Sequence, residues 1–329
     1  MMKVVAVLLL VLLLIGCSED QSGHKAATET TQVSVVTGMQ PGTGLLRIAD
    51  SEHYFQQQNI TVDIKEKPSG KLAILSVIDK EVNADIIFAA DIAYLANQHL
   101  LNEYRVIATV FDSDNLNAIA SKQRFDDIQA ISGKTLCTQY LSALHFFGQV
   151  LVERSAIQNV TYKFYKVSEL NDRLLDGECD FITTREPLIA DLLVKSEDQA
   201  QLAFFPGIYL QHELMLAHDR VPDEILSRFI KAMIEAESLF NTAPEQANLI
   251  LSQSLKTSPK QLSILHNDSV WEVSLYQPLL PLLERQMEWL ISHGVDEGKG
   301  KSFTSSASLR PDVLQHVAPL RQTVIAYED

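Results

Sequence analysis

Two stretches of the chain repeat the same order of elements, and this order constrains the fold more than any other feature. In the first stretch, an alternating strand over 60–65 is followed by a helical face over 71–78 and a buried-type strand over 85–88. In the second, a strand over 135–138 precedes a helix over 142–153 and an alternating strand over 161–166. Strands joined by helices pair in parallel through right-handed crossovers. The sequence therefore predicts two α/β lobes, each with a mostly parallel sheet flanked by helices.

The elements around these stretches complete the pattern. A short strand over 33–36 opens the folded part, and a strand over 179–182 follows a helix over 168–176. We expect Ser168 to cap the N-terminus of that helix and Gly177 to follow its C-terminus. From Pro222 the pattern turns helical, over 222–241, 244–251, 259–267 and 277–293, with one possible helix over 311–320. Trp271, Trp289 and Tyr276 are interpreted as packing residues.

The first seventeen residues combine a basic start with a short apolar run. Lys3 is followed by twelve apolar residues, Val4–Ile15, and then by Gly16 and Cys17. This arrangement is typical of a secretory signal peptide, and twelve helical residues are too short for a hydrocarbon core of roughly 30 Å. The four residues Leu14–Cys17 resemble the bacterial lipobox, which implies cleavage before Cys17 and lipidation of its sulfur. The alternative is an ordinary signal peptide followed by a free cysteine.

The expected anchor and tether follow from this start. Residues 1–16 form the lipoprotein signal peptide, and residues 17–32 form the lipidated Cys17 and a polar, flexible tether. Several acyl chains would hold the mature protein at a membrane surface. We therefore expect it on the periplasmic side of the cell envelope, at the outer membrane if the cell is Gram-negative, because Ser18 rather than Asp follows the cysteine.

Composition and motifs exclude several classes of function. The 329 residues include 27 Lys and Arg and 42 Asp and Glu, a formal net charge of −15, so a nucleic-acid partner is not expected. Ser132–Thr135 looks like the end of a phosphate-binding P-loop, but the required upstream glycine is Ile128. His212 and Glu213 lack a second histidine four positions on, and no set of histidines has zinc-site spacing. We expect no catalytic residues, no metal and no cofactor.

Cys137 and Cys179 fall on different predicted strands without a partner motif. The interpretation we favour is a pair of buried, inert thiols, with a periplasmic disulfide as the alternative and a catalytic cysteine least expected.

Four segments together resemble a known family. They are Pro41–Ala49, then Gly70–Leu72 leading to Asp85–Phe88, then Phe125–Ile128 with Ile131–Leu136, and finally Leu175–Asp180 followed by Glu186 and Pro187. In order and spacing these segments resemble the periplasmic solute-binding proteins of ABC importers, more narrowly the nitrate, sulfonate, taurine and thiamine-precursor binders. The resemblance covers residues 33–294, about four-fifths of the chain.

The resemblance implies the two-lobed periplasmic-binding-protein (type II) fold, with a two-strand hinge near Ala108–Ser113 and Phe204–Tyr209. Lobe 1 would comprise residues 33–111 and a helical return over 207–293, lobe 2 would comprise residues 112–206, and residues 294–329 would form a C-terminal tail. Ligands of open α/β sheets bind beyond the carboxyl ends of the parallel strands. The cleft residues would therefore come from the loops that follow the strands.

The candidate ligand-binding residues in those loops are Thr37, Thr43, Ser69, Asp91, Gln139, Tyr140, Ser142, Thr184, Arg185 and Glu186. Several have plainer alternatives. Ser69 and Ser142 are also typical helix caps, and Tyr140 is also a typical packing residue. Arg185 could be a solvated surface charge; inside the cleft it would favour a carboxylate, sulfonate or phosphate.

Two functions fit these observations. The first is a membrane-anchored binding protein, not an enzyme, that delivers a small-molecule ligand to an ABC permease. The alternative is a ligand-sensing lipoprotein of the same fold that regulates the periplasmic sensor domain of a membrane signalling protein.

Overall fold

The computed structural model describes residues 30–259, 262, 268–294 and 308–325. The predicted signal peptide, Cys17 and most of the helix predicted over 259–267 lie outside these residues.

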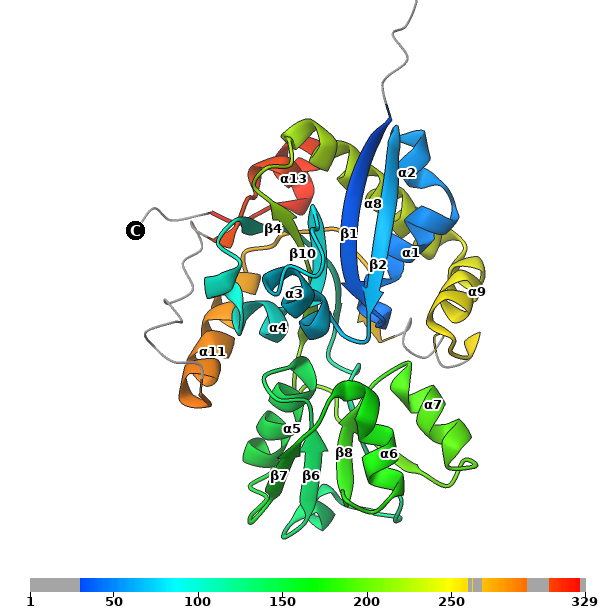
Figure 1. Ribbon diagram of the computed structural model, residues 1–329, viewed down its shortest axis with the longest axis vertical. Coiled ribbons are helices and arrows are strands. Elements are labelled where there is room, and N and C mark those ends of the chain that lie inside the picture. Colours follow the sequence, from blue (N-terminus) through cyan, green and yellow to red (C-terminus); the bar gives the residue numbers. More distant parts are fainter. Residues whose placement is uncertain (1–29, 260–261, 263–267, 295–307, 326–329) are drawn as a thin grey trace, which may run out of the picture.

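The described strands form two separate sheets (Figure 1). The larger sheet has the order β11-β4-β10-β3-β1-β2, and the smaller has the order β7-β6-β8-β5-β9. The strands of the larger sheet are β1 (Thr31–Gly38), β2 (Ile60–Lys67), β3 (Ile86–Ala90), β4 (Tyr104–Ser113), β10 (Gln211–His218) and β11 (Ser269–Val270). Those of the smaller sheet are β5 (Ala118–Ser121), β6 (Thr135–Thr138), β7 (Thr161–Phe164), β8 (Phe181–Thr184) and β9 (Gln201–Phe204). We call the part built on the larger sheet lobe 1 and the part built on the smaller sheet lobe 2.

The predicted parallel pairing is confirmed in both lobes. β1 pairs in parallel with β2 and β3, and β6 pairs in parallel with β7 and β8. β10 runs antiparallel to β3 and β4, and β11 runs antiparallel to β4. In lobe 2, β5 runs antiparallel to β8 and β9.

The chain passes between the sheets over residues 114–117 and again over residues 205–210. Ala108–Ser113, expected to form the first crossing, instead remain in β4, because this end of the strand pairs with β10. The second passage overlaps the predicted Phe204–Tyr209.

Helices cover both sheets. In lobe 1 they are α1 (Gly44–Ser51), α2 (Tyr54–Gln57), α3 (Gly70–Ile78), α4 (Asp91–Leu95), α8 (Asp223–Thr242), α9 (Pro244–Leu255), α11 (Leu279–Ser292) and α13 (Asp312–Val317). In lobe 2 they are α5 (Ala143–Arg154), α6 (Leu170–Leu175) and α7 (Leu188–Lys195). Helices α1, α2 and α13 all pack on α8, so the described part of the tail belongs to lobe 1, whereas α3 packs on β1 and β3. Within the described ranges, no helix is both long and apolar enough to cross a membrane.

Two predicted helix ends have different outcomes. Gly177 has a φ of +79°, the left-handed conformation expected after a helix C-terminus, so that prediction is confirmed. Ser168 does not cap α6, because Val167–Glu169 form a 3₁₀ turn and the α-helix begins at Leu170. The buried Val167 holds this turn against lobe 2.

The sheet of lobe 2 has a buried face on each side, because neighbouring strand residues point in opposite directions. Ile119, Leu136 and Phe181 face the large core that continues into lobe 1. Ala120, Cys137 and Ile182, each one residue further along, face a second core under α6. Buried strands of this kind contain continuous apolar runs, which is why they could be recognised in the sequence.

Cys137 and Cys179 form a disulfide, with their Cα atoms 5.9 Å apart. The interpretation as inert thiols is therefore wrong, and the alternative is confirmed. The parallel pairing of β6 with β8 brings the two residues together, since Cys137 lies opposite Ile182. Cys179 itself precedes β8 rather than lying within it.

Candidate functional site

A small cavity lies between the lobes, where the carboxyl ends of their parallel strands face each other. Its lining comes from the segments after β1, β2 and β3 in lobe 1 and after β6, β7 and β8 in lobe 2. The lining residues are Gln40, Ser69, Gly70, Lys71, Ala90, Ala93, Gln139, Ser142, Ala143, Leu144, Val167, Arg185 and Gln211. The cavity volume is about 20 Å³, which is room for about one water molecule.

Two helix N-termini open onto this cavity. The Ser69 hydroxyl accepts a hydrogen bond from Leu72 N and begins α3, and the Ser142 hydroxyl accepts one from His145 N and begins α5. Both capping interpretations are therefore confirmed. The exposed N–H groups of a helix N-terminus carry partial positive charge, so both helices favour a negative group between the lobes.

The first of these helices approaches β1 closely because both contacting residues are glycines. A Cβ atom on Gly38 would lie 2.3 Å from Gly70 N. Any side chain at position 38 would therefore push α3 away from the end of β1 and move Ser69, Gly70 and Lys71 relative to the cavity.

Arg185 crosses from lobe 2 to lobe 1 and is only 4% exposed. Its guanidinium donates to Met39 O at 3.3 Å, to Gln40 Oε1 at 3.0 Å and to Glu186 O at 2.7 Å. All three acceptors are uncharged oxygens, and burial lowers the pKa of Arg185 to about 10. The alternative of a solvated surface charge is wrong, because the opposite lobe covers this side chain.

Gln40 joins Arg185 to a buried carboxyl group. Its Oε1 accepts from Arg185 and, at 3.4 Å, from Gly70 N, while its Nε2 donates to Glu213 Oε2. Glu213 is 0% exposed, and burial raises its pKa to about 8. The other carboxyl oxygen of Glu213 has no hydrogen-bond partner among the described residues.

Lys71 supplies the second formal charge of the cavity lining. Its ammonium group donates to the backbone carbonyl of Tyr140 in lobe 2 and lies 5.8 Å from the centre of the Tyr140 ring. Burial lowers the pKa of Lys71 to about 8. The Tyr140 ring also packs edge-on against Phe164, so the packing interpretation holds for this side chain.

Asp91 is fully buried next to the cavity rather than in its lining. Its carboxylate accepts hydrogen bonds from Tyr209 Oη, from Gln286 Nε2 at 2.9 Å and from two backbone N–H groups, those of Ile92 and His212. These contacts connect α4, β10, α11 and the second crossing at the base of the cleft.

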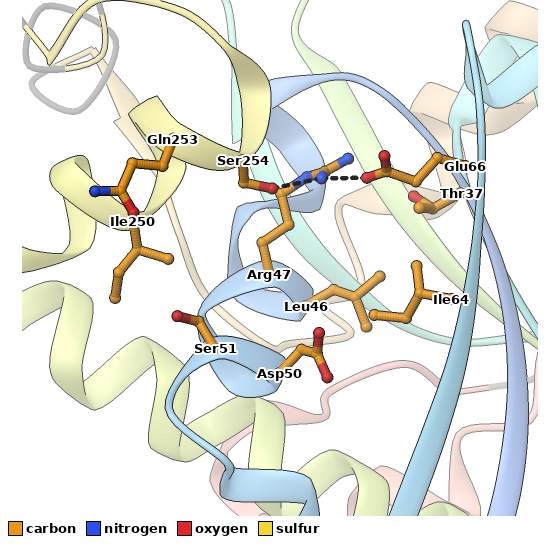
Figure 2. Close-up of a pocket in the computed structure, with 10 residues that line it drawn as sticks. All are labelled: Thr37, Leu46, Arg47, Asp50, Ser51, Ile64, Glu66, Ile250, Gln253 and Ser254. Atoms are coloured by element: carbon orange, nitrogen blue, oxygen red, sulfur yellow. Dashed lines mark hydrogen bonds and ion pairs between the residues drawn. The ribbon is translucent and has the colours of Figure 1, made fainter.

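Thr37 and Thr43 are not part of the lining of the interlobe cavity. Thr37 lines a separate pocket of about 580 Å³ between α1, β2 and α9, as Figure 2 shows. In that pocket Arg47 donates to Glu66 Oε1 and to Ser254 Oγ, and its Nε donates to Thr43 Oγ1 at 3.0 Å. The Thr37 hydroxyl donates to Gly38 O at 3.4 Å, so these hydrogen bonds of the two threonines lie within lobe 1.

The last two candidates lie beside Arg185. Thr184 is fully buried in β8, opposite Ala118 of β5. Glu186 accepts from Ala190 N and, at 3.0 Å across the lobes, from Thr257 Oγ1, and burial raises its pKa.

Of the ten candidates, Ser69, Gln139, Ser142 and Arg185 line the interlobe cavity. Sequence reasoning missed Gln40, Lys71 and Gln211. The available signal was their position, because Gln40 and Lys71 each follow a parallel strand of lobe 1 by a few residues and Gln211 begins the strand after the second crossing.

Comparison with known proteins identifies the fold. No protein-family model and no curated protein sequence matches the chain. Among solved structures, the alkanesulfonate-binding protein of Xanthomonas axonopodis pv. citri with MOPS bound has a TM-score of 0.69 at 15% identity, covering 86% of this chain and 100% of its own. The aliphatic sulphonate binding protein of Escherichia coli has a TM-score of 0.68 at 12% identity, covering 85% and 92%. The nitrate-binding protein of Synechocystis PCC 6803 has a TM-score of 0.66 at 9% identity, covering 89% of each chain. The chain therefore has the two-lobed fold of periplasmic binding proteins.

Proposed function

We propose that the protein is an extracytoplasmic solute-binding receptor, not an enzyme, that closes its lobes on a small anion and presents it to an ABC permease. The observation that carries this proposal is Arg185, a fully buried guanidinium at the cleft whose three hydrogen bonds all go to uncharged oxygens. A buried charge without a paired opposite charge is costly, and an anionic solute would offset that cost.

The remaining lining favours the same sign of ligand. Lys71 and Arg185 are the only formally charged residues among those that line the cavity, and both are cationic. The N-termini of α3 and α5 add partial positive charge from opposite lobes. A sulfonate, nitrate or similar small anion would thus be held between two cations and two helix ends. The solved sulfonate- and nitrate-binding structures of the same fold make these anions the first ones to test.

Closure would follow from contacts that one solute makes with both lobes. The lobes are already bridged by several contacts, among them those of Arg185 with Met39 and Gln40, Lys71 with Tyr140, and Glu186 with Thr257. Because the cavity volume is only about 20 Å³, a solute of several atoms requires Arg185 to turn aside or the lobes to separate. Binding would stabilise the closed lobes in proportion to the difference in affinity between open and closed forms.

We further propose that Cys17 carries the lipid anchor on the periplasmic side of the envelope, at the outer membrane in a Gram-negative cell. The Cys137–Cys179 disulfide supports an oxidising compartment of this kind. Labelled palmitate should be incorporated into the full-length protein in cells and should be absent from the Cys17→Ala variant. Equal labelling of the two proteins would contradict the proposal.

The ligand class can be tested by thermal shift and calorimetry on the soluble chain beginning at Ser18. The panel contains methanesulfonate, taurine, nitrate, a phosphonate, thiamine-pathway pyrimidines and, as cationic controls, simple amines. A ligand at a hundred times its Kd should add about 2.7 kcal/mol to the free energy of unfolding. An anion should stabilise the wild type and lose most of its effect in Arg185→Met, a variant of similar length without charge. Stabilisation by amines alone would refute the anion assignment.

Delivery to a permease needs a separate measurement. A strain without the gene should lose uptake of the radiolabelled anion that binds in the screen, and the wild-type gene should restore it. Unchanged uptake with normal binding would favour the sensor alternative.

A further inference from the structure

Glu213 lies at the centre of lobe 1, directly behind the cleft. Its strand, β10, has β3 on one side and β4 on the other, so Glu213 is paired with Ala90 and with Phe111. The backbone of Gly42 packs on its side chain, since a Cβ atom there would lie 3.0 Å from both Cβ and Oε2 of Glu213. This packing comes from lobe 1 alone. On the side of the cleft the carboxyl group is covered by Gln40, which lines the interlobe cavity and contacts Arg185 of lobe 2.

The surroundings of Glu213 suit its neutral form. Arg185 lies across Gln40, whose amide separates the guanidinium from the carboxyl group, and Arg47 adds a more distant positive charge. Asp91 acts in the opposite sense, as a like charge. The carboxyl group accepts one hydrogen bond, from Gln40, and its Oε1 atom has no partner among the described residues. Burial dominates, and the pKa of Glu213 lies near 8.

Building on the proposed function, we propose that Glu213 takes up one proton from solvent when the lobes close on an anion beside Arg185. In the free receptor Glu213 would be ionised. This receptor would bind the anion together with one proton, and the product would be the closed complex with a neutral Glu213 carboxylic acid. In this scheme the anion pairs with the positive charge of Arg185. Without the anion, that charge stabilises the Glu213 carboxylate across Gln40. The anion also places a second negative charge near Glu213, and two like charges in one buried site disfavour ionisation.

The coupling predicts how affinity depends on pH. In an open cleft water would reach the Gln40 side of Glu213, and the pKa of Glu213 would be lower than in the closed complex. Between that value and the higher pKa of the complex, the complex holds more protons than the free receptor. Affinity for the anion should therefore fall by up to tenfold per pH unit as the pH rises through this window.

The test is isothermal calorimetry with methanesulfonate and nitrate, neither of which titrates near neutral pH. Bis-Tris, imidazole and Tris are the buffers, because sulfonate buffers are themselves candidate ligands. Titrations in imidazole and in Tris at one pH should differ in heat by the difference between the two ionisation enthalpies, multiplied by the number of protons that the complex takes up. In Glu213→Gln, which keeps the shape and removes the titration, the affinity should become independent of pH up to the pKa of Lys71.

Two further variants assign the effect to one group. Lys71 also lines the cavity and has a pKa near 8, so Lys71→Met should weaken binding but keep the pH slope. Glu186 is another buried carboxyl group beside the cleft, and Glu186→Gln should also keep the slope. A slope that persists in Glu213→Gln and disappears in either of the other variants would overturn the proposal.

An infrared measurement gives a second readout. Wild type minus Glu213→Gln spectra of the anion-loaded protein at neutral pH should contain the carbonyl band of a protonated carboxylic acid. Its absence would refute the coupling while leaving the proposed function intact. Failure of every anion to bind would instead refute the proposed function, and the coupling with it.

Discussion

Removal of the Cys137–Cys179 disulfide should destabilise lobe 2 by an amount that the chain length between the cysteines sets. The two residues are 42 positions apart in the sequence. Cross-linking a loop of that length removes conformational entropy from the unfolded chain worth about 4 kcal/mol at 25 °C. The effect should be concentrated in lobe 2, because the bridge joins β6 to the residue before β8 and both sulfurs belong to its second core.

The assay is urea unfolding of the soluble chain from Ser18, which lacks Cys17, followed by circular dichroism. Three samples separate the cross-link from its packing: oxidised wild type, wild type reduced with dithiothreitol, and the double variant Cys137→Ala/Cys179→Ala. Reduction retains every heavy atom of the two side chains and should account for most of the loss. The double variant should lose somewhat more, because it also removes two buried sulfur atoms. A reduced protein within about 1 kcal/mol of the oxidised one, with an unchanged m-value, would refute the entropic reasoning.

Three other predictions test separate parts of the structure. Arg185→Met should weaken binding of methanesulfonate or nitrate by roughly 10- to 100-fold, since hydrogen bonds to a charged group contribute about 1.5–3 kcal/mol, and calorimetry measures this directly. Burial lowers the pKa of His145 to about 4, below the value of 6.5 in the unfolded chain. The neutral imidazole therefore makes its full contribution to the free energy of unfolding above pH 6.5, and this contribution is lost as the pH falls towards 4. Urea midpoints at pH 7.5 and at pH 5 should differ less in His145→Phe than in wild type. Asp91→Asn should cost about 1–3 kcal/mol in unfolding free energy, because an amide cannot accept all the hydrogen bonds that Tyr209, Gln286 and two backbone groups donate.

The order of strands and helices was predictable because it depends on local patterns. The apolar run Leu136–Cys137 and the run Phe181–Ile182 are buried on both faces of a sheet, and such runs read as strands in any context. The helix caps Ser69 and Ser142 were equally local, since each side chain bonds a backbone N–H three residues away.

The burial of Arg185 could not be predicted in the same way. Its partners Met39 and Gln40 are more than 140 residues away in the sequence and belong to the other lobe. A charged residue in a loop is solvated unless something covers it, and only the tertiary arrangement shows what does. The favoured interpretation of Cys137 and Cys179 as free thiols was wrong for a similar reason, because only the pairing of β6 with β8 sets the distance between the two cysteines.

The errors at Ser168 and at the first crossing concern element ends. A serine before an apolar run favours an N-cap, but Ser168 lies inside the 3₁₀ turn that the buried Val167 begins, and the α-helix starts only after this turn. Likewise Ala108–Ser113 continue β4 because β10, about 100 residues later, supplies their hydrogen-bond partners. In both cases contacts with distant residues overrode a local signal. The roles of the ten candidate residues in ligand binding stay predictions.

The position of β10 has a consequence for the order in which the molecule can be built. The strands of lobe 2 all lie in one continuous stretch, from Ala118 to Phe204, so this lobe contains its whole sheet before β10 emerges from a ribosome or a translocation channel. The sheet of lobe 1 is not complete at that point. Without β10 it is divided into β4 and the unit β3-β1-β2, which are not hydrogen-bonded to each other. Long-range pairings of this kind form slowly. The N-terminal half of lobe 1 must therefore wait, incomplete, until the inserted lobe has been synthesised.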